Sequence, residues 1–400
     1  MMRADFSITT SRNGACMPTT FRSVGPWYST EEAAEIMGRT PGHVSRLCKN
    51  GEFSSNNGQL ESVKVGNSYL LHQEIVKRLP GNEFTLSDIA NYYHRRLRVA
   101  VNRKNYRQKP RILGILAPEA GDAASMVYAR TLQKACREIG FDLGLVRNDL
   151  AEIKARITRA NKDPSIHGIF VFYPIFKDRE DKKIKELIDP IKDIEGLSSF
   201  WSKKLYLNER YLDKDKKKKA ILPCTSLGIL KILAYVDNLD ELAGQTFAGK
   251  KITIFNRSDV VGHPLAYMLI NDGATVYSFD IESGVHMQKN GKEVPISRKE
   301  ALRKSDTIIT GVPSRAFEKV RGEEIKENTT CLNFSFVQNF EESAKEKAGI
   351  YVPRVGPMTI AMCVRNAIRL YENNRDVYEH VDSAYPFEWE KYGTVVQLAA

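Results

Sequence analysis

One segment, residues 251–280, constrains the fold of this chain more than any other. The apolar run KITIF at residues 251–255 is typical of a buried parallel strand, and the loop at residues 256–264 leads into a helical stretch at residues 265–270. A second strand is predicted at residues 274–279. Two strands joined by a crossover helix are the repeating unit of an α/β fold with a parallel sheet.

Asp280 follows the second strand, about 20 residues past the loop, where an acid of a dinucleotide-binding unit hydrogen-bonds the ribose 2'-hydroxyl. A carboxylate at this place also repels a 2'-phosphate, so the unit predicts an NAD site. The glycine pattern GxGxxG is absent, which leaves a strand–helix–strand unit without a ligand as the alternative.

Length and composition predict a globular protein of two or three domains. The chain has 400 residues, of which 42% are hydrophobic and 27% charged, and no stretch is apolar enough to span a membrane. Its six cysteines lack paired spacing, so neither a disulfide framework nor a metal site is indicated. We therefore expect a cytoplasmic protein. The arginine-bearing residues 1–26 are expected to be a disordered leader rather than a targeting sequence.

The formal net charge of +11 is unevenly distributed. No acid interrupts the cations between His94 and Arg111, which are Arg95, Arg96, Arg98, Arg103, Lys104, Arg107, Lys109 and Arg111. An amphipathic helix with a basic outer face is predicted to begin this stretch. Three interpretations stay open: a solvated surface, attraction of a polyanionic substrate tail, or contact with nucleic acid.

Residues 27–81 form a module of their own. A helix is predicted after Ser29 and Thr30, a second helix from residue 40, a strand pair at residues 63–71 and a last helix at residues 74–79. The runs YSTEEAAEIMG and VKVG within this module resemble the excisionase type of winged helix-turn-helix domain.

That resemblance implies that the second helix enters the major groove of DNA. The side chains that it would present are those of His43, Ser45, Arg46 and Lys49. Six acids and six bases balance between Tyr28 and Pro80, and a neutral module gains little nonspecific affinity for phosphates. A protein-docking role is therefore the alternative to DNA binding.

From residue 84 onward, strands and helices alternate, which predicts two α/β lobes with a ligand site in the cleft between them. Strands are predicted at residues 111–117, 168–173, 307–312 and 330–334, and helices at residues 124–139, 227–235 and 359–372.

Five ordered motifs in this part of the chain carry a specific resemblance. They are DAASMVY at residues 122–128, PIKDIEG at 190–196, PCT at 223–225, NRSDVVGHP at 256–264 and VGPMTIAM at 355–362. Together they resemble the methylenetetrahydrofolate dehydrogenase/cyclohydrolase family.

The resemblance implies a domain order and a homodimer. The expected parts are a folate-binding catalytic domain at residues 84–222, a Rossmann-type NAD-binding domain at 223–352, a helix returning to the catalytic domain at 353–374 and a tail at 375–400.

Departures from the bifunctional pattern favour the monofunctional NAD-dependent branch of this family, known from fungi. Leu132 stands four residues after Tyr128, where bifunctional members carry the lysine that cyclohydrolase chemistry requires. The glutamine of their VQLPLP-like strand is replaced in VFYPIF at residues 171–176, and Glu195 replaces the second acid of their KDVDG motif.

We therefore expect oxidation of 5,10-methylenetetrahydrofolate to the methenyl compound by hydride transfer to NAD, with cyclohydrolase activity absent or weak. No general base is needed, because the product cation is stabilised by its own nitrogens, so the protein has to align the two ring systems. The alternative is a DNA-binding regulator whose dehydrogenase-like half senses folate or NAD.

The resemblance also implies roles for individual residues. Tyr128 is expected to lie along the folate rings, Glu195 to hydrogen-bond the pterin and Phe172 to border the pocket, while Pro357 and Thr359 close the folate side. The loop at the helix start is expected to hold the cofactor diphosphate through backbone amides, and later strand ends to flank the nicotinamide. These cofactor candidates are Asn256, Arg257, Ser258, Val260, Val261, Asp280, Gly311, Val312, Pro313, Asn333 and Thr225.

Overall fold

The computed structural model divides the chain into two compact units, Met1–Arg78 and Leu79–Ala400. The residues that it describes are 27–37, 39, 41–49, 62–65, 68–72, 86–117, 123–173, 175–176, 180–237, 239, 245–380 and 387–396. The expected leader at residues 1–26 and the helix predicted at 74–79 lie outside these ranges. Within them, no helix combines the length and the apolar character needed to cross a membrane.

The N-terminal unit contains the two helices and the strand pair that were predicted. Its elements are β1 (Trp27–Ser29), α1 (Thr30–Met37), α2 (Pro41–Lys49), β2 (Ser62–Val65) and β3 (Ser68–His72). The sheet has the order β1-β3-β2, and both pairings are antiparallel. The Ser29 side chain accepts from the Glu32 amide at 3.2 Å while the Ser29 amide donates to the Glu32 carboxylate at 2.8 Å, a capping box that begins α1.

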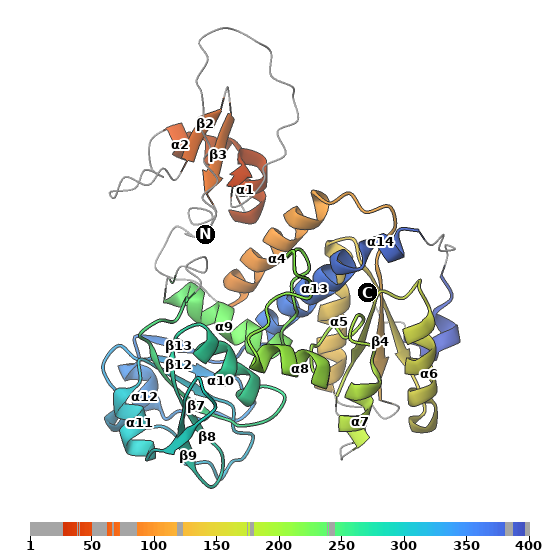
Figure 1. The fold of residues 1–400 in the computed structure, drawn as a ribbon. Coiled ribbons are helices and arrows are strands. Elements are labelled where there is room, and N and C mark those ends of the chain that lie inside the picture. Colours follow the sequence, from red (N-terminus) through yellow and green to blue (C-terminus); the bar gives the residue numbers. More distant parts are fainter. Residues whose placement is uncertain are drawn as a thin grey trace. The chain divides into compact units, whose positions relative to one another are not determined.

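The second unit contains two sheets, and the first carries the catalytic-domain motifs (Figure 1). Its order is β14-β5-β4-β6, with β4, β5 and β6 parallel and β14 antiparallel to β5. The predicted strands at residues 111–117 and 168–173 are confirmed, whereas β5 and β14 were not predicted. The elements are β4 (Arg111–Leu116), α5 (Ala123–Glu138), β5 (Asp142–Arg147), α6 (Leu150–Lys162), β6 (Gly168–Val171), α7 (Glu180–Leu187), η2 (Trp389–Tyr392) and β14 (Thr394–Val395).

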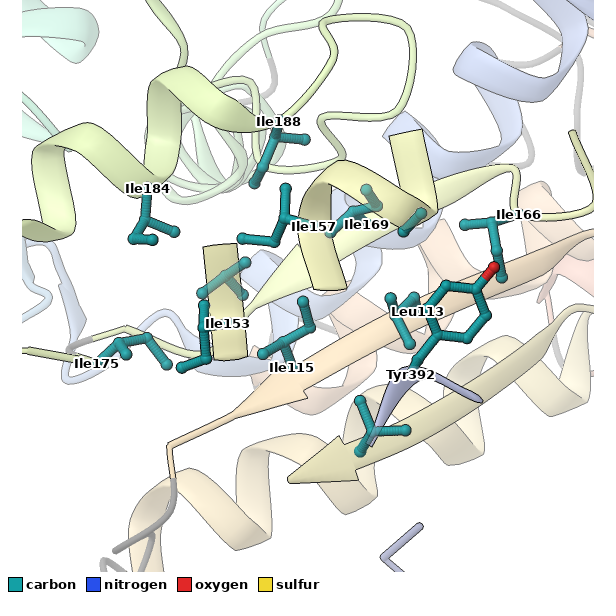
Figure 2. Close-up of a cluster of buried hydrophobic side chains, with 13 residues drawn as sticks. Leu113, Ile115, Ile153, Ile157, Ile166, Ile169, Ile175, Ile184, Ile188 and Tyr392 are labelled. Carbon is teal, nitrogen blue, oxygen red and sulfur yellow. The ribbon is translucent and has the colours of Figure 1, made fainter. Parts of the chain in front are cut away.

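The C-terminal segment belongs to the core of this sheet. Figure 2 shows Tyr392 among the buried isoleucines of α6, β4 and β6. Trp389 covers Gly144 of β5, where a Cβ atom would collide with the indole ring. Expecting a mere tail at residues 375–400 therefore missed an edge strand and its anchoring aromatic residues.

The second sheet has the order β10-β9-β8-β7-β11-β12-β13. Its five neighbouring strands β8, β7, β11, β12 and β13 are parallel. From β7, the chain places β8 on one side and β11 on the other, which makes the β7–β11 edge a topological switch point. The elements are β7 (Lys251–Phe255), α10 (Gly262–Asn271), β8 (Thr275–Phe279), β9 (Gly284–Met287), β10 (Glu293–Pro295), α11 (Arg298–Lys304), β11 (Thr307–Thr310), η1 (Gly322–Glu324), β12 (Thr330–Asn333), α12 (Glu342–Lys347) and β13 (Ile350–Val352).

The long C-terminal helix α13 packs against α4, α5 and α9 (Figure 1). Gly228 of α9 permits this packing, since a Cβ atom there would lie 3.3 Å from the backbone of Met358 and Thr359. Helix α13 thus contacts α5 and β6 as well as α9. The remaining elements are α4 (Leu86–Asn102), α8 (Ser199–Tyr206), α9 (Cys224–Val236), α13 (Gly356–Asn373) and α14 (Arg375–Tyr378).

Candidate active site

The loop after β7 is organised by one side chain, that of Asn256. Its Nδ2 donates to the carbonyl of Gly311 at 2.9 Å, and its Oδ1 accepts from the amides of Ser258 and Gly262, both at 3.1 Å. A Cβ atom at Gly262 would collide with the Asn256 backbone, so glycine lets α10 begin directly against the strand. Asn256 thus joins the carboxyl ends of β7 and β11 at the switch point, where α/β sheets bind their ligands.

Two serine hydroxyls add further hydrogen bonds to the same loop. Ser258 Oγ donates to Asn256 Oδ1 at 2.7 Å and accepts from the Val261 amide at 3.2 Å, while Ser226 Oγ on α9 donates to the Val261 carbonyl at 2.9 Å. Val260 is exposed at the tip of the loop. The loop is therefore held in shape from within, and residues 258–260 form its exposed face.

Asp280 lies directly after β8, as predicted, and beside the loop. Its Oδ1 accepts from the amides of Ser283 at 2.7 Å and Glu282 at 2.9 Å, and its Oδ2 lies 3.6 Å from Arg257 Nη1. The Ser283 amide above all, with Glu282 and Arg257 adding to it, holds the pKa of this carboxyl below its usual range. The same Arg257 donates to Glu293 Oε1 at 2.6 Å, a partner that sequence reasoning missed.

The ends of β11 and β12 form the next part of the site. Asn339, which is fully buried, accepts from the Val312 amide at 2.9 Å and donates to the Val312 carbonyl at 3.1 Å. Asn333 is also fully buried, and it accepts from Thr310 Oγ1 at 3.1 Å and donates to the Ser335 carbonyl at 2.9 Å. The Asn333 side chain therefore shapes this loop from inside.

Gly311 directly follows β11, and its carbonyl accepts the hydrogen bond from Asn256 of the β7 loop. A Cβ atom at Gly311 would collide with the ring of Phe334, so glycine allows the aromatic side chain to cross the end of β11. Val312 and Pro313 continue from it, Val312 half-buried and Pro313 exposed.

The folate-side candidates gather between α5 and β6. The Tyr128 ring lies 6.0 Å from Phe170 and 5.9 Å from Phe172, measured between ring centroids. Leu132, one helical turn after Tyr128, is only 2% exposed. Lys134 is 78% exposed and lies 4.0 Å from Glu138, so its amine faces away from the Leu132 position.

Tyr128 is also the point where α5 meets α13. Its hydroxyl lies 3.5 Å from the Sγ of Cys363, another residue that sequence reasoning missed. Burial, together with Cys363, raises the pKa of Tyr128 well above its ordinary value. Tyr128 therefore presents a neutral phenol and an aromatic face.

Glu195 stands beside this aromatic group. Burial raises the pKa of its carboxyl well above the ordinary value, and Cys363 adds to the increase, although the backbone of Val171 donates to it. The neighbouring acid Asp193 accepts from the amides of Gly196 and Ser198, both at 3.0 Å, so its carboxylate stabilises the turn.

The side chain of Lys192, from the same motif, binds elsewhere. Its Nζ donates to the carbonyls of Ala160 at 2.8 Å and Asp163 at 2.7 Å. Glu195 is therefore the acid of the PIKDIEG motif that is left to bind a ligand.

Helices α9 and α13 close the site from the other side. Cys224 begins α9 and lies 3.3 Å from both the Ile194 carbonyl and Asn366 Nδ2, and burial raises the pKa of its thiol. Asn366 also donates to the carbonyls of Ile194 at 2.9 Å and Leu222 at 2.8 Å. Cys224 is thus a packing residue, and Asn366 ties α13 to the segments on either side of the domain junction.

The remaining candidates for cofactor and folate binding lie in the first turns of α9 and α13. Thr225 is half-buried in the first turn of α9. Pro357 stands in the first turn of α13, and Thr359 Oγ1 lies 3.4 Å from the Val355 carbonyl.

The candidates for DNA binding lie on α2, in the N-terminal unit. Arg46 and Lys49 are exposed and Ser45 is half-buried, while the side chain of His43 lies outside the described residues.

Two family models match most of the second unit. The tetrahydrofolate dehydrogenase/cyclohydrolase catalytic domain matches residues 85–195, and the tetrahydrofolate dehydrogenase/cyclohydrolase NAD(P)-binding domain matches residues 223–375. The N-terminal unit lies outside both matches.

Individual relatives agree. A methylenetetrahydrofolate dehydrogenase [NAD(+)] of Schizosaccharomyces pombe is 40% identical over 282 residues, covering 67% of this chain and 87% of the relative. One from Saccharomyces cerevisiae is 38% identical over 314 residues, covering 74% and 97%. The solved NAD-dependent 5,10-methylenetetrahydrofolate dehydrogenase of Saccharomyces cerevisiae superposes with a TM-score of 0.67 at 37% identity, covering 74% of this chain and 98% of that one. This chain belongs to the tetrahydrofolate dehydrogenase/cyclohydrolase family.

Proposed function

We propose that this chain oxidises 5,10-methylenetetrahydrofolate to 5,10-methenyltetrahydrofolate with NAD as the hydride acceptor. The observation that carries the proposal is the ionised Asp280 at the end of β8. Arg257 lies between Asp280 and Glu293, so this arginine is not available to a 2'-phosphate. The relatives named as NAD(+) enzymes support the same assignment.

The chain's own residues fit this cofactor. The Asn256 loop is closed against α10 by Gly262, and its exposed residues 258–260 are available to a diphosphate. NAD supplies the hydride acceptor when bound. The protein's part is to hold the nicotinamide near Gly311 and Pro313 and to align it with the folate.

On the folate side, Tyr128 and Phe172 supply aromatic surface, and Glu195 supplies the acceptor for pterin N–H groups. An acid whose charge is disfavoured by burial gains most from ligand donors, because they replace the lost hydration. Leu132 offers no proton-transfer group for activating water, so the methenyl product is released without hydrolysis.

The test is turnover by the purified full chain with methylenetetrahydrofolate and NAD, NADP or no cofactor. Methenyl formation with NAD supports the proposal. Binding of folate and NAD without turnover would contradict it and favour the sensor alternative.

For residues 27–81 we propose a winged helix-turn-helix domain, with Arg46 and Lys49 on the exposed side of α2. DNA binding is tested by a mobility shift at low and moderate salt. The double variant Arg46→Gln/Lys49→Gln is expected to weaken any shift, and the absence of a shift by the unchanged protein would favour protein docking.

We also propose that the basic stretch after α4 attracts the polyglutamate tail of the folate substrate. Arg111 is buried, with its amide on His167, and Lys104 pairs with Glu372 at 2.8 Å, so these two cations serve the fold. Arg107 and Lys109 are exposed. We expect added glutamates to lower KM in a salt-sensitive manner, and equal KM values for mono- and polyglutamates would contradict this.

A homodimer and a cytoplasmic location remain part of the proposal. Sedimentation of the purified chain measures the first, and the location of a tagged full-length chain measures the second.

A further inference from the structure

A cavity of 280 Å³ lies in the second unit, apart from the candidate active site. It is bounded by α8, α9, α10, α13 and the segment in which Tyr211 and Lys219 form an antiparallel bridge. None of the residues assigned above to folate or to NAD lines it.

The lining of this cavity is strongly basic. Its cations are Lys204, Arg210, Lys219, Lys231, Arg365 and Arg369. The two acids among the described lining residues already have partners, since Glu209 lies 2.7 Å from Lys204 and Asp272 lies 2.5 Å from Arg210.

Three of the cations, Lys219, Arg365 and Arg369, repel one another. Arg365 and Arg369 are four residues apart on α13 and so lie on one face of the helix. Arg369 donates to the Ala220 carbonyl at 3.3 Å, and no carboxylate oxygen of the described residues lies within 4.0 Å of Arg369 or Lys219. Burial and these arginines lower the pKa of Lys219, and burial beside Arg365 lowers the pKa of Arg369.

Lys219 and Arg369 together are unfavourable without a counter-charge. An arginine keeps its proton in a protein, so it cannot relieve the repulsion by neutralising. Like charges brought together with partial loss of solvent destabilise the folded chain. An anion bound between them would remove that cost.

The shape and chemistry of the cavity indicate the anion. Guanidinium groups bind tetrahedral oxyanions through paired hydrogen bonds, and three cations match a dianion better than a monoanion. Apolar side chains, among them Leu227, Leu230 and Met268, together with the Tyr211 ring, line the rest of the cavity. We propose that this cavity binds a small phosphate-bearing metabolite, with the phosphate held by Lys219, Arg365 and Arg369.

The site connects to the proposed active site through two helices. Leu227 and Leu230 lie on α9, whose first turn contains Thr225, and the arginines lie on α13, which also carries Thr359 and Cys363. A bound phosphate would therefore stabilise the packing of α9 against α13.

The test is thermal unfolding of the full chain at constant ionic strength. Inorganic phosphate, ribose 5-phosphate and succinate are titrated separately, with and without saturating NAD, because NAD fills any phosphate site in the β7 loop. Saturable stabilisation by phosphate that persists with NAD is expected. A larger effect of ribose 5-phosphate would show that the apolar wall also contributes, and an equal effect of succinate would overturn the phosphate assignment.

Variants locate the effect. The Lys219 side chain is exposed, so Lys219→Gln should not impair folding. Both Lys219→Gln and Arg369→Gln are expected to raise the apparent Kd for phosphate about tenfold or more. Arg303→Gln, an exposed arginine on α11, is the control for loss of one positive charge and is expected to leave Kd unchanged. No saturable stabilisation, or the same Kd in Lys219→Gln as in the control, would overturn the proposal. If Arg369→Gln does not fold, Lys219→Gln alone decides.

Discussion

Arg257 lies 3.6 Å from Asp280 Oδ2, so the cation of the β7 loop is paired with the carboxylate at the end of the neighbouring strand. Its other terminal nitrogen donates to Glu293 at 2.6 Å. Two acids around one arginine make this corner of the site net negative, and that charge favours a free 2'-hydroxyl over a 2'-phosphate.

Cofactor choice should therefore change when these acids are removed. Asp280→Ser is expected to raise the ratio of kcat/KM for NADP to that for NAD about tenfold, and adding Glu293→Gln should raise it further by freeing Arg257. Glu282→Gln removes an exposed acid nearby and serves as the control. Steady-state kinetics with both cofactors measure the ratio, and an unchanged ratio in the double variant would contradict the carboxylate argument.

Leu132 is expected to act as a core residue of the catalytic domain. Because its side chain is 2% exposed, Leu132→Ala should lower the free energy of unfolding by about 2–5 kcal/mol, whereas Leu132→Met should cost less than about 1.5 kcal/mol. Chemical denaturation measures both. Equal stability of the alanine variant and the unchanged chain would mean that this position is not packed as described.

Several parts of the site followed from local sequence. Lys251–Phe255 and the acid at residue 280 were predictable because a buried parallel strand is a continuous apolar run and strand ends lie at one sheet edge. Leu132 was singled out by the resemblance, four residues after Tyr128, and the structure places both residues on α5, with the Tyr128 ring near Phe170 of β6 and Leu132 buried.

The missed residues depend on contacts between distant segments. Glu293 reaches Arg257 only because β9 and β10 fold back beside β8, and Asn339 meets Val312 from 27 residues away. β14 has two residues, too few to show an alternating pattern, and its place is set by Trp389 and Tyr392. No local periodicity reports such pairings.

Replacing Glu195 with glutamine should impair the reaction with folate but raise the stability of the folded chain at neutral pH. Glu195→Gln is expected to lower kcat/KM about 10- to 100-fold, because a carboxylate acceptor for the pterin is lost. Its folded pKa is raised above the ordinary 4.5, so the unchanged chain is relatively most stable below that pH and loses stability as pH rises through the raised pKa.

The variant should therefore unfold at a higher temperature than the unchanged chain at neutral pH, and the difference should vanish near pH 4. Thermal unfolding across this range checks the sign. A variant that is less stable at neutral pH would show that Glu195 is ionised and well paired.

The C-terminal segment should be required for stability. Asp163 accepts from Tyr392, from Ser165 and from Lys391 Nζ at 2.9 Å, and these hydrogen bonds outweigh the effect of burial and lower its pKa. Tyr392→Phe is expected to cost about 1–2 kcal/mol at neutral pH. The contribution of Asp163 is present above its ordinary pKa and is lost as pH falls towards the lowered value, so the cost should shrink in acid. Denaturation at two pH values measures it, and a cost that is independent of pH would contradict the assigned partner.

The fate of the methenyl compound tests the central claim most directly. The purified full chain is mixed with 5,10-methylenetetrahydrofolate and NAD, and the methenyl and formyl products are quantified over time beside a protein-free sample of methenyltetrahydrofolate. We predict that methenyltetrahydrofolate forms faster with NAD than with NADP and then decays no faster than in the protein-free sample. Preferential use of NADP, or rapid conversion to formyltetrahydrofolate, would contradict the account.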